Sequence, residues 1–442
     1  MEVVRPYTVE VKKPFLLNGS YSKSVITWYV DSPSKIEEVS GPFTRVEFHE
    51  PDIGSRQKLI KQLLKFGWKP IIFTDPTDAH PEGQPKLTIK GEPVESLMEI
   101  EIPVGKDLAM WYTLQHRKSQ IEGWINNLRG DGRLTAGANS CGTNTARMRH
   151  RNVVNVPKAD PKVIFGYEMR DLFIAKDGYR LVGHDAASLE ARVMAHYSIP
   201  YDNGEFAREI LHGDIHNKNA RIFFPEETFG RDKGDPIFDA YRSISKNGFY
   251  ALIYGAQPKK LAATLGCSIG EAKRLFDEFW KQNPGLGLLR DRVIKICESQ
   301  GWVPGIDGRR IYIRSSHSAL NALFQSTGAI AMKVSMVFLD YWVKKNELDV
   351  LKVIDMHDEG QAEENLNEIK IFTSSTKNEL IKKLDDKLIY SDIHYDGNHY
   401  SKYYSPYGEL AVKSIRKAGQ YLGFNVDLDG EYKVGRSWAE TH

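Results

Sequence analysis

The stretch Leu181-Val-Gly-His-Asp-Ala-Ala-Ser-Leu-Glu-Ala-Arg-Val-Met-Ala-His-Tyr197 places one carboxylate where a strand gives way to a helix. Residues 179–184 are typical of a short buried strand, and Ser188 is a suitable N-cap for a helix whose apolar residues recur four apart. Asp185 is then expected at the rim of the core, where a divalent cation and phosphate oxygens can approach it. A single aspartate at a strand end is more often a cap or a turn former, so its role depends on residues downstream.

Composition sets broad limits on the kind of protein. The 442 residues suffice for roughly three domains or one large molecule with lobes around a shared sheet. Charged residues make up 27% and hydrophobic residues 41%, which is an ordinary globular balance. The net charge of +2 does not indicate a polyanion partner, so nucleic acid would have to bind through local basic faces.

The cysteines argue against a zinc protein, and the most apolar run argues against a membrane protein. Cys141, Cys267 and Cys297 have neither paired nor metal-ligand spacing, which argues against a zinc site and suits a reducing compartment. The apolar run 327–343 carries Lys333 and Asp340, so it predicts a buried helix and no membrane span. We therefore expect a soluble, intracellular protein.

A ladder of polar side chains follows in the helix-rich stretch 202–314. Arg242, Lys246 and Tyr250 recur at a spacing of four, and Tyr254 continues the series. Residues four apart on a helix differ by about 40° around its axis and about 6 Å along it, so they share one face. Two cations on that face can hold a triphosphate while the ring stacks on base or sugar, although a surface helix with an aromatic edge shows the same spacing.

A second acidic position lies in Met356-His-Asp-Glu-Gly360. Residues 350–356 predict a strand, His357-Asp358 a tight turn, and residues 360–363 the returning strand, so that Asp358 is lifted clear of the sheet. His357 has no partner His or Cys at metal-ligand spacing. Upstream, His216 lies in Gly213-Asp-Ile-His-Asn-Lys-Asn219.

Together these groups resemble the three polymerase motifs of the DNA polymerase I family (family A), and residues 202–216 most resemble replicative polymerases of small tailed bacteriophages. The resemblance runs from about residue 42 to residue 442. It implies an α+β fold with the right-hand architecture of palm, fingers and thumb and an antiparallel palm sheet. The implied divisions are an N-terminal segment or thumb insertion (1–50), the thumb (51–130), the first part of the palm with motif A (131–200), the fingers with motif B (201–316) and the second part of the palm with motif C (317–442).

The resemblance implies a template-directed DNA polymerase that adds dNTPs to a primer 3′ end by a two-metal mechanism in phage DNA replication. The implied catalytic residues are Asp185, Asp358 and Lys246. Two Mg²⁺ ions, which Mn²⁺ can replace, are expected on Asp185, Asp358 and the backbone carbonyl of Ala186. Nucleotide contacts are expected from His216, Arg242, Lys246, Tyr250 and Glu190. Primer-template contacts are expected from Arg147, Arg149, Tyr254, Asn321, Gln325 and His357. For Glu359, a supporting role behind the metal ligands and a contact with solvent both stay open.

One segment departs from the family pattern. Thr145-Ala-Arg-Met-Arg-His-Arg-Asn-Val-Val-Asn-Val-Pro157 resembles the family's Thr-Gly-Arg…Asn-Leu-Gln-Asn-Ile-Pro segment, which contacts the minor groove of the primer-template. Here Ala146 replaces the usual glycine and the segment is shorter. The sequence therefore leaves open whether Arg147 or Arg149 takes the groove position.

Three further helices are expected. The first is capped by Ser55, stops at Gly67, and carries Leu59, Ile60, Leu63 and Leu64 on one face. The second covers 106–129, with Ile121, Trp124, Ile125 and Leu128 as a core stripe and His116-Arg117-Lys118 as a candidate phosphate contact. The third covers 367–388.

Two other functions share part of this pattern. A catalytically silent nucleic-acid-binding subunit is disfavoured because both aspartates and the whole ladder are present. A single-subunit RNA polymerase is disfavoured by Glu190, which can pack with Tyr250 beneath the sugar and exclude a 2′-hydroxyl, as in the DNA polymerases this chain resembles.

The expected partners are primer-template DNA and dNTPs, with no membrane. No Asp-x-Glu pair follows a predicted strand in residues 1–135, so a 3′→5′ exonuclease site cannot be placed there. We expect either a trimmed chain or one subunit of a split polymerase, with a separate exonuclease chain and a processivity factor as candidate partners. The expected location is the cytoplasm of the infected bacterial host.

Overall fold

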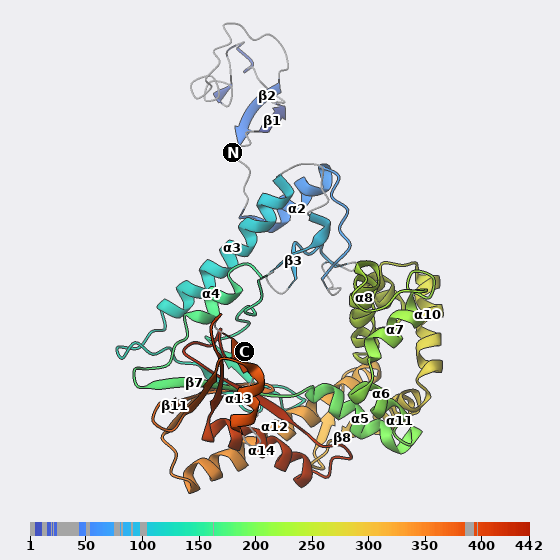
Figure 1. Ribbon diagram of the computed structural model, residues 1–442. Coiled ribbons are helices and arrows are strands. Elements are labelled where there is room, and N and C mark those ends of the chain that lie inside the picture. Colours follow the sequence, from blue (N-terminus) through green and yellow to red (C-terminus); the bar gives the residue numbers. More distant parts are fainter. Residues whose placement is uncertain are drawn as a thin grey trace. The chain divides into compact units, whose positions relative to one another are not determined.

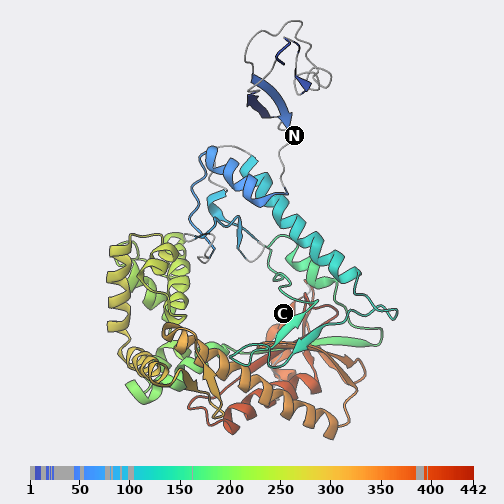
Figure 2. The same cartoon turned by 180° about the vertical axis from the view of Figure 1, so that it is seen from behind.

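The computed structural model describes residues 5–10, 16–18, 20, 22–23, 44–49, 54–74, 80, 83–89, 92–97, 104–161, 163–384, 393–395 and 397–442 (Figures 1 and 2). It divides into two compact units, Met1–Thr113 and Leu114–His442. The boundary falls inside helix α3 (Val104–Ile125), so the range 51–130 predicted as a thumb extends over both units.

The first unit has a small core of its own. Strands β1 (Arg5–Glu10) and β2 (Thr44–His49) pair antiparallel, as do β3 (Thr88–Ile89) and β4 (Glu92–Pro93). Helix α2 (Arg56–Lys65) and the 3-10 turn η1 (Glu95–Leu97) contribute to the core, in which Trp68 donates a hydrogen bond to Ser96 at 3.1 Å. The buried residues are Leu59, Ile60, Leu63, Trp68, Leu87, Val94 and Leu97.

Helix α2 ends as predicted but differs from the prediction in two details. Gly67 takes φ +87° just after the helix, as expected of a stop residue. The expected four-residue apolar face is wrong at Leu64, which is 45% exposed, and the Ser55 side chain makes no capping hydrogen bond. Packing therefore uses only part of the apolar face that the periodicity indicated.

Helix α3 also corrects the sequence analysis. It ends four residues before the predicted end at Arg129, and Ile125 and Leu128 are 60% and 51% exposed, so the expected core stripe is wrong at these two positions. Trp124 is buried as predicted. The candidate phosphate contact Arg117 is only 3% exposed, and its Nε donates to the Ile164 carbonyl at 3.3 Å. Because it is buried, the Arg117 guanidinium cannot reach a phosphate. It binds the backbone of a distant segment inside the protein instead.

The antiparallel sheet predicted for the palm lies in the second unit. Its strand order is β10 (Val350–Met356), β11 (Glu359–Asn365), β7 (Tyr179–Ala186) and β15 (Gly430–Gly435), and every neighbouring pair is antiparallel. Helices α12 (Ala319–Lys345) and α14 (Pro406–Tyr421) lie along one side of this sheet in both views. Val182 faces that side and Leu181 faces the other, as the two-residue period of a strand requires. The central strand β7 is thus covered on both faces.

The segment Ser316–Lys345 is apolar and long enough to cross a membrane by length and composition. However, 61% of its most apolar window is buried inside the protein. It is therefore the core helix that the apolar run predicted.

A helical bundle occupies one side of the second unit, shown green to yellow in Figure 1. Its largest core cluster includes Phe206, Phe223, Phe249 and Phe279, which come from four different helices. The hairpin of β8 (Trp302–Pro304) and β9 (Arg310–Tyr312) precedes α12. The helices are α5 (Leu189–Asp202), α6 (Glu205–His212), α7 (Ile215–Phe223), α8 (Pro236–Ile253), α9 (Pro258–Leu265), α10 (Ile269–Gln282) and α11 (Pro284–Gln300).

The remaining elements include one further correction. The predicted helix at 367–388 is wrong in its first part, which forms strand β12 (Lys370–Ser374); helix α13 (Lys377–Leu384) follows, and residues 385–388 lie outside the described residues. Strand β12 pairs with β14 (Tyr400–Tyr404), which also pairs with β13 (Ile393–Tyr395). Helix α4 (Gly166–Asp171) and the hairpin β5 (Gly137–Asn139) and β6 (Arg149–Arg151) complete the unit.

Candidate active site

Strand pairing brings the two predicted metal-binding aspartates together. Asp185 near the end of β7 lies opposite Glu359 at the start of β11, and the backbone N–H of Ala186 donates to the Asp358 carbonyl at 3.0 Å. Asp358 stands in the predicted tight turn, in which His357 adopts φ +60°. The strand, turn and strand predicted around Asp358 are confirmed. Two carboxylates far apart in the sequence thus lie at the same end of the sheet.

This end of the sheet carries excess negative charge. The pKa of Asp185 is raised to about 8, mainly by burial and in addition by the carboxylates of Asp358, Glu359 and Glu431, while the charge of Lys158 opposes the rise. A nearby cation would relieve this repulsion. Among the described residues no cluster of three or more His, Cys, Asp and Glu side chains is suited to a metal. A pair of carboxylates fits Mg²⁺, which commonly takes one or two carboxylates together with water and substrate phosphates.

Ser188 occupies the predicted position just before α5 but does not act as predicted. It adopts φ +51°, and its side chain makes no capping hydrogen bond. The turn that joins β7 to α5 therefore gains no stabilisation from a serine cap.

Glu359 faces away from solvent, which contradicts one of its two expected roles. It is only 8% exposed, and it accepts hydrogen bonds from Trp438 Nε1 and from Gln361 Nε2 at 2.9 Å. His442 Nδ1 lies 2.9 Å from its other oxygen. Although burial alone raises the pKa of Glu359, the bond and charge of His442 and the other hydrogen bonds lower it overall. This carboxylate therefore ties segment 438–442 to the base of the turn that carries Asp358.

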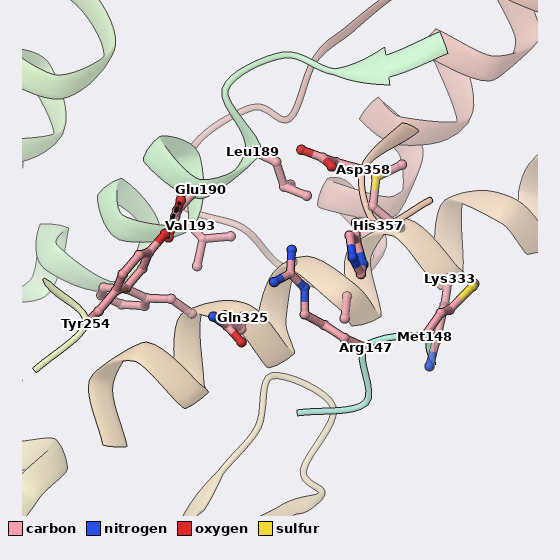
Figure 3. Close-up of a pocket in the computed structure, with 14 residues that line it drawn as sticks. Arg147, Met148, Leu189, Glu190, Val193, Tyr254, Gln325, Lys333, His357 and Asp358 are labelled. Atoms are coloured by element: carbon pink, nitrogen blue, oxygen red, sulfur yellow. Dashed lines mark hydrogen bonds between the residues drawn. The ribbon is translucent and has the colours of Figure 1, made fainter. Parts of the chain in front are cut away.

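A pocket opens beside Asp358 and collects residues from five parts of the chain (Figure 3). Arg147 projects into it, whereas Arg149 lies exposed on β6, so Arg147 is the arginine at the pocket. The Tyr254 hydroxyl donates to the two Glu190 oxygens at 2.9 and 3.2 Å. The lining residues are Arg147, Met148, Leu189, Glu190, Val193, Tyr254, Phe324, Gln325, Gly328, Ala329, Met332, Lys333, His357 and Asp358.

Burial changes the pKa of two groups in this pocket, the carboxyl of Glu190 and the phenol of Tyr254. Burial raises the pKa of Glu190, while the Tyr254 hydrogen bond and the Arg147 charge oppose that rise. Burial and Glu190 together raise the pKa of Tyr254. Tyr254 thus stays a neutral donor that holds the Glu190 carboxylate in place.

The predicted ladder lies on α8, but its members differ in their surroundings. Tyr250 lies with its ring centroid 5.9 Å from that of His216 on α7. Arg242 is held from α7: its Nε donates to Asn217 at 2.6 Å, and a terminal nitrogen donates to both oxygens of Asp214 at 3.0 and 3.1 Å. Lys246 is exposed. The positive charge of Arg242 is therefore partly neutralised, whereas that of Lys246 is open to a ligand.

His216 is uncharged at neutral pH. Burial is the main cause that lowers its pKa. The charges of Lys246 and Arg242 lower the pKa further, and the charge of Asp214 opposes them. A neutral imidazole can still donate one N–H to a phosphate oxygen. Asp214 itself was missed by the sequence analysis; its position just before α7, where its side chain accepts from the Asn217 N–H, was the available signal.

Three primer-template candidates lie near this pocket or on its helix. Gln325 lines the pocket from α12, and Asn321 lies one turn earlier with a side-chain oxygen that is buried without a hydrogen-bond partner in the described part of the chain. His357 packs edge-on against His150 at 5.4 Å between ring centroids. Burial, Arg147 and His150 lower the pKa of His357.

Comparisons with known proteins point in one direction. A family model described as DNA polymerase family A matches residues 34–393. Among curated relatives, the DNA-directed DNA polymerase of Escherichia phage Phieco32 is 28% identical over 77% of this chain and 60% of its own length. Those of Enterobacteria phage T3 and Escherichia phage T7 are 28% and 27% identical, each over 92% of this chain and 55% of its own length. The chain thus spans about 55 to 60% of the length of these relatives.

A solved structure shows the same fold. The POL domain of Pol1 from M. smegmatis, in complex with DNA primer-template and dNTP, aligns with a TM-score of 0.64. The alignment covers 89% of this chain and 62% of that chain at 22% sequence identity, a level at which the likeness concerns the fold alone.

Proposed function

The chain belongs to DNA polymerase family A, and on that premise we propose that it is a DNA-directed DNA polymerase that extends a primer 3′ end on a DNA template. The observation that carries the proposal is the pairing of β7 with β11, which sets Asp185 beside the turn of Asp358, and Asp358 lines the pocket together with Arg147 and Glu190. Phosphoryl transfer requires mainly positioning and charge neutralisation, and these residues supply both.

In the proposed reaction the primer 3′-hydroxyl loses its proton to solvent as its oxygen bonds to the α-phosphorus of the dNTP, and the bond between that phosphorus and the departing pyrophosphate breaks. Asp185 and Asp358 would hold the divalent cations, with the Ala186 carbonyl as a further ligand. When bound there, Mg²⁺ would lower the pKa of the primer hydroxyl and neutralise charge on the leaving group.

The α8 ladder serves the nucleotide in this proposal. Lys246 neutralises the leaving pyrophosphate or gives it a proton, and Arg242 and His216 donate hydrogen bonds to the phosphates. Tyr250, beside His216, stacks on the sugar and base. Arg147, Tyr254, Asn321, Gln325 and His357 face the primer-template.

A primer-extension assay with Mg²⁺ tests the proposal and separates it from the two alternatives. We expect extension with dNTPs on a DNA template and little extension with ribonucleotides. A silent nucleic-acid-binding subunit would bind the duplex without extending it. An RNA polymerase would prefer ribonucleotides.

Glu190→Ala is expected to raise ribonucleotide incorporation about 10- to 100-fold relative to dNTP incorporation, because it opens space beneath the sugar. Tyr254→Phe is the matched variant: it keeps the acid and removes only the hydroxyl that holds it. We expect a smaller rise for that variant in single-nucleotide incorporation assays. An unchanged preference in Glu190→Ala would remove Glu190 from sugar selection.

Mg²⁺ is expected to stabilise the protein more at pH 8 than at pH 6. Without metal, the pKa of Asp185 is about 8 in the folded protein and 3.8 when unperturbed. The folded protein therefore retains a proton that the unfolded chain loses, and the stability from this group falls as pH rises from about 3.8 to 8. Mg²⁺ must displace this proton at pH 6 but not at higher pH.

Melting temperatures with and without Mg²⁺ at both pH values measure the effect, which should reach about 1.4 kcal/mol when the ion exceeds its Kd about tenfold. Asp185→Asn is the control, because it should abolish both the Mg²⁺ effect and its pH dependence. A larger Mg²⁺ shift at pH 6 than at pH 8 contradicts the proposed site.

Primer-template DNA and dNTPs are the proposed substrates, and phage DNA replication in the cytoplasm of a bacterial host is the proposed setting. The separate exonuclease chain and the processivity factor stay predictions. Degradation of mismatched primers by this chain alone, together with its mass in solution, tests them.

A further inference from the structure

Lys333 joins the long helix α12 to the loop that carries Arg147. Its Nζ donates to the carbonyl of Ser140 and, at 2.6 Å, to the carbonyl of Ala146. Both acceptors are neutral backbone oxygens, although a lysine in a protein usually keeps its ammonium in water. Lys333 is partly buried, and these two hydrogen bonds hold its ammonium against the backbone of the loop.

The two acceptors lie at opposite ends of one loop. The loop connects β5 with β6, and Ser140 follows β5 directly while Ala146 precedes Arg147. Ala146 is buried at 4% exposure and adopts φ +60°, a conformation that costs an alanine roughly 1 kcal/mol. Such a conformation persists only where the surroundings enforce it. The Lys333 ammonium closes the loop across both ends and supplies that constraint.

The orientation of Arg147 follows from this contact. The Ala146 carbonyl and the Arg147 N–H belong to one planar peptide unit, so a hydrogen bond to the carbonyl also orients the backbone of Arg147. From there the Arg147 side chain enters the pocket with Glu190, His357 and Asp358 (Figure 3). Gln325 lines the same pocket about two helical turns before Lys333. Lys333 lines the pocket as well, so α12 both contributes side chains to the pocket and supports the loop that carries Arg147.

We propose that Lys333 is a positioning residue that fixes Arg147 in the active site by clamping the Ser140 and Ala146 carbonyls. The inference rests on the proposed polymerase function for its kinetic consequence, but the clamp itself is independent of activity. It also accounts for the presence of Arg147 rather than Arg149 at the pocket, because only Arg147 shares a peptide unit with a clamped carbonyl.

The kinetic test is a double-mutant cycle between Lys333→Met and Arg147→Ala. Methionine keeps an unbranched stem of similar length and removes the donors. Lys333→Met should lower kcat/KM for primer extension about 10- to 100-fold, and in the Arg147→Ala background it should cause little further loss. Lys344→Met is the matched control, because Lys344 lies exposed on the same helix and pairs with Asp340; it should retain full activity. Independent, multiplicative losses in the double variant would overturn the proposal.

An activity-independent test uses limited trypsin digestion followed by mass spectrometry. Lys333→Met should increase the rate of cleavage after Arg147 several-fold relative to the unmodified protein, whereas Lys344→Met should leave it unchanged. An unchanged rate overturns the clamp even if the protein proves to have no polymerase activity. An inactive unmodified protein with faster cleavage in Lys333→Met instead refutes the proposed function and retains the clamp.

If Lys333→Met does not fold, Lys333→Arg gives the same comparison, because it keeps the charge but presents its donors in a planar group. Melting temperatures of all variants identify that case. Where only Lys333→Arg folds, it should extend primers more slowly than the unmodified protein, and an unchanged rate would overturn the proposal. Where both variants fold, partial recovery of extension in Lys333→Arg relative to Lys333→Met is expected, and equal activity in the two would count against a role for the donors.

Discussion

Asp358→Asn is expected to reduce primer extension by at least about 10³-fold, equivalent to about 4 kcal/mol of transition-state stabilisation. The reason is charge: asparagine keeps the size of the side chain but removes the negative charge that holds a divalent cation. Asp358 is exposed in its turn, so the substitution leaves no cavity in the core. Steady-state extension with Mg²⁺ measures the loss, and a binding assay with labelled primer-template should show nearly unchanged affinity.

Asp340→Asn is the control for this prediction, because Asp340 is an exposed acid on α12 that pairs only with Lys344 among the described residues. It should extend primers normally. Asp185→Asn should be as inactive as Asp358→Asn, yet it should not lose stability, because it removes the like-charge repulsion that burial intensifies. Extension by either asparagine variant at near the normal rate would overturn the metal assignment.

Lys246→Ala is expected to lower kcat about 10²- to 10³-fold, because it removes a charge-assisted donor from the leaving pyrophosphate. Arg242→Ala should act differently and raise the KM for dNTP about tenfold, or about 1.4 kcal/mol. The difference follows from the structure: Asp214 and Asn217 already hold Arg242, while Lys246 is exposed. Single-turnover kinetics over a range of dNTP concentrations separate the two effects.

Lys273→Ala is the matched control for Lys246→Ala, because Lys273 is an exposed lysine on α10, another helix of the same bundle. It should leave both kcat and KM unchanged. Equal effects on kcat from Lys246→Ala and Lys273→Ala would show that general positive charge, rather than the position on α8, supports the reaction.

Elements with a strong local signal were predictable from the sequence. The strand before Asp185, the hairpin turn at Asp358 and the helix with Arg242, Lys246 and Tyr250 all lie where expected. Each depends on hydrophobic periodicity or turn chemistry within about ten residues. The stretch 367–388 failed because its first part pairs with β14, and strand pairing can override a helical pattern.

Burial of individual side chains was less predictable. The periodicity placed Ile125 and Leu128 on a core face, yet both are exposed, and it left Arg117 open to phosphate, yet Arg117 is buried. Periodicity identifies a face but not what covers it. The carbonyl of Ile164 that accepts from Arg117 belongs to a distant segment that no local pattern indicates.

The sequence by itself determined the residue types that carry the chemistry and the local elements that hold Asp185, Asp358 and the α8 ladder. Only the tertiary structure decided how these elements act together. Strand β11 sets Asp358 beside Asp185, Asp214 takes up part of the Arg242 charge, and Glu359 anchors segment 438–442. Lys333 donates to the Ala146 carbonyl next to Arg147, and Arg147 rather than Arg149 lines the pocket. The physical reason is that local propensity depends on neighbours along the chain, whereas hydrogen bonds, burial and charge coupling depend on neighbours in space.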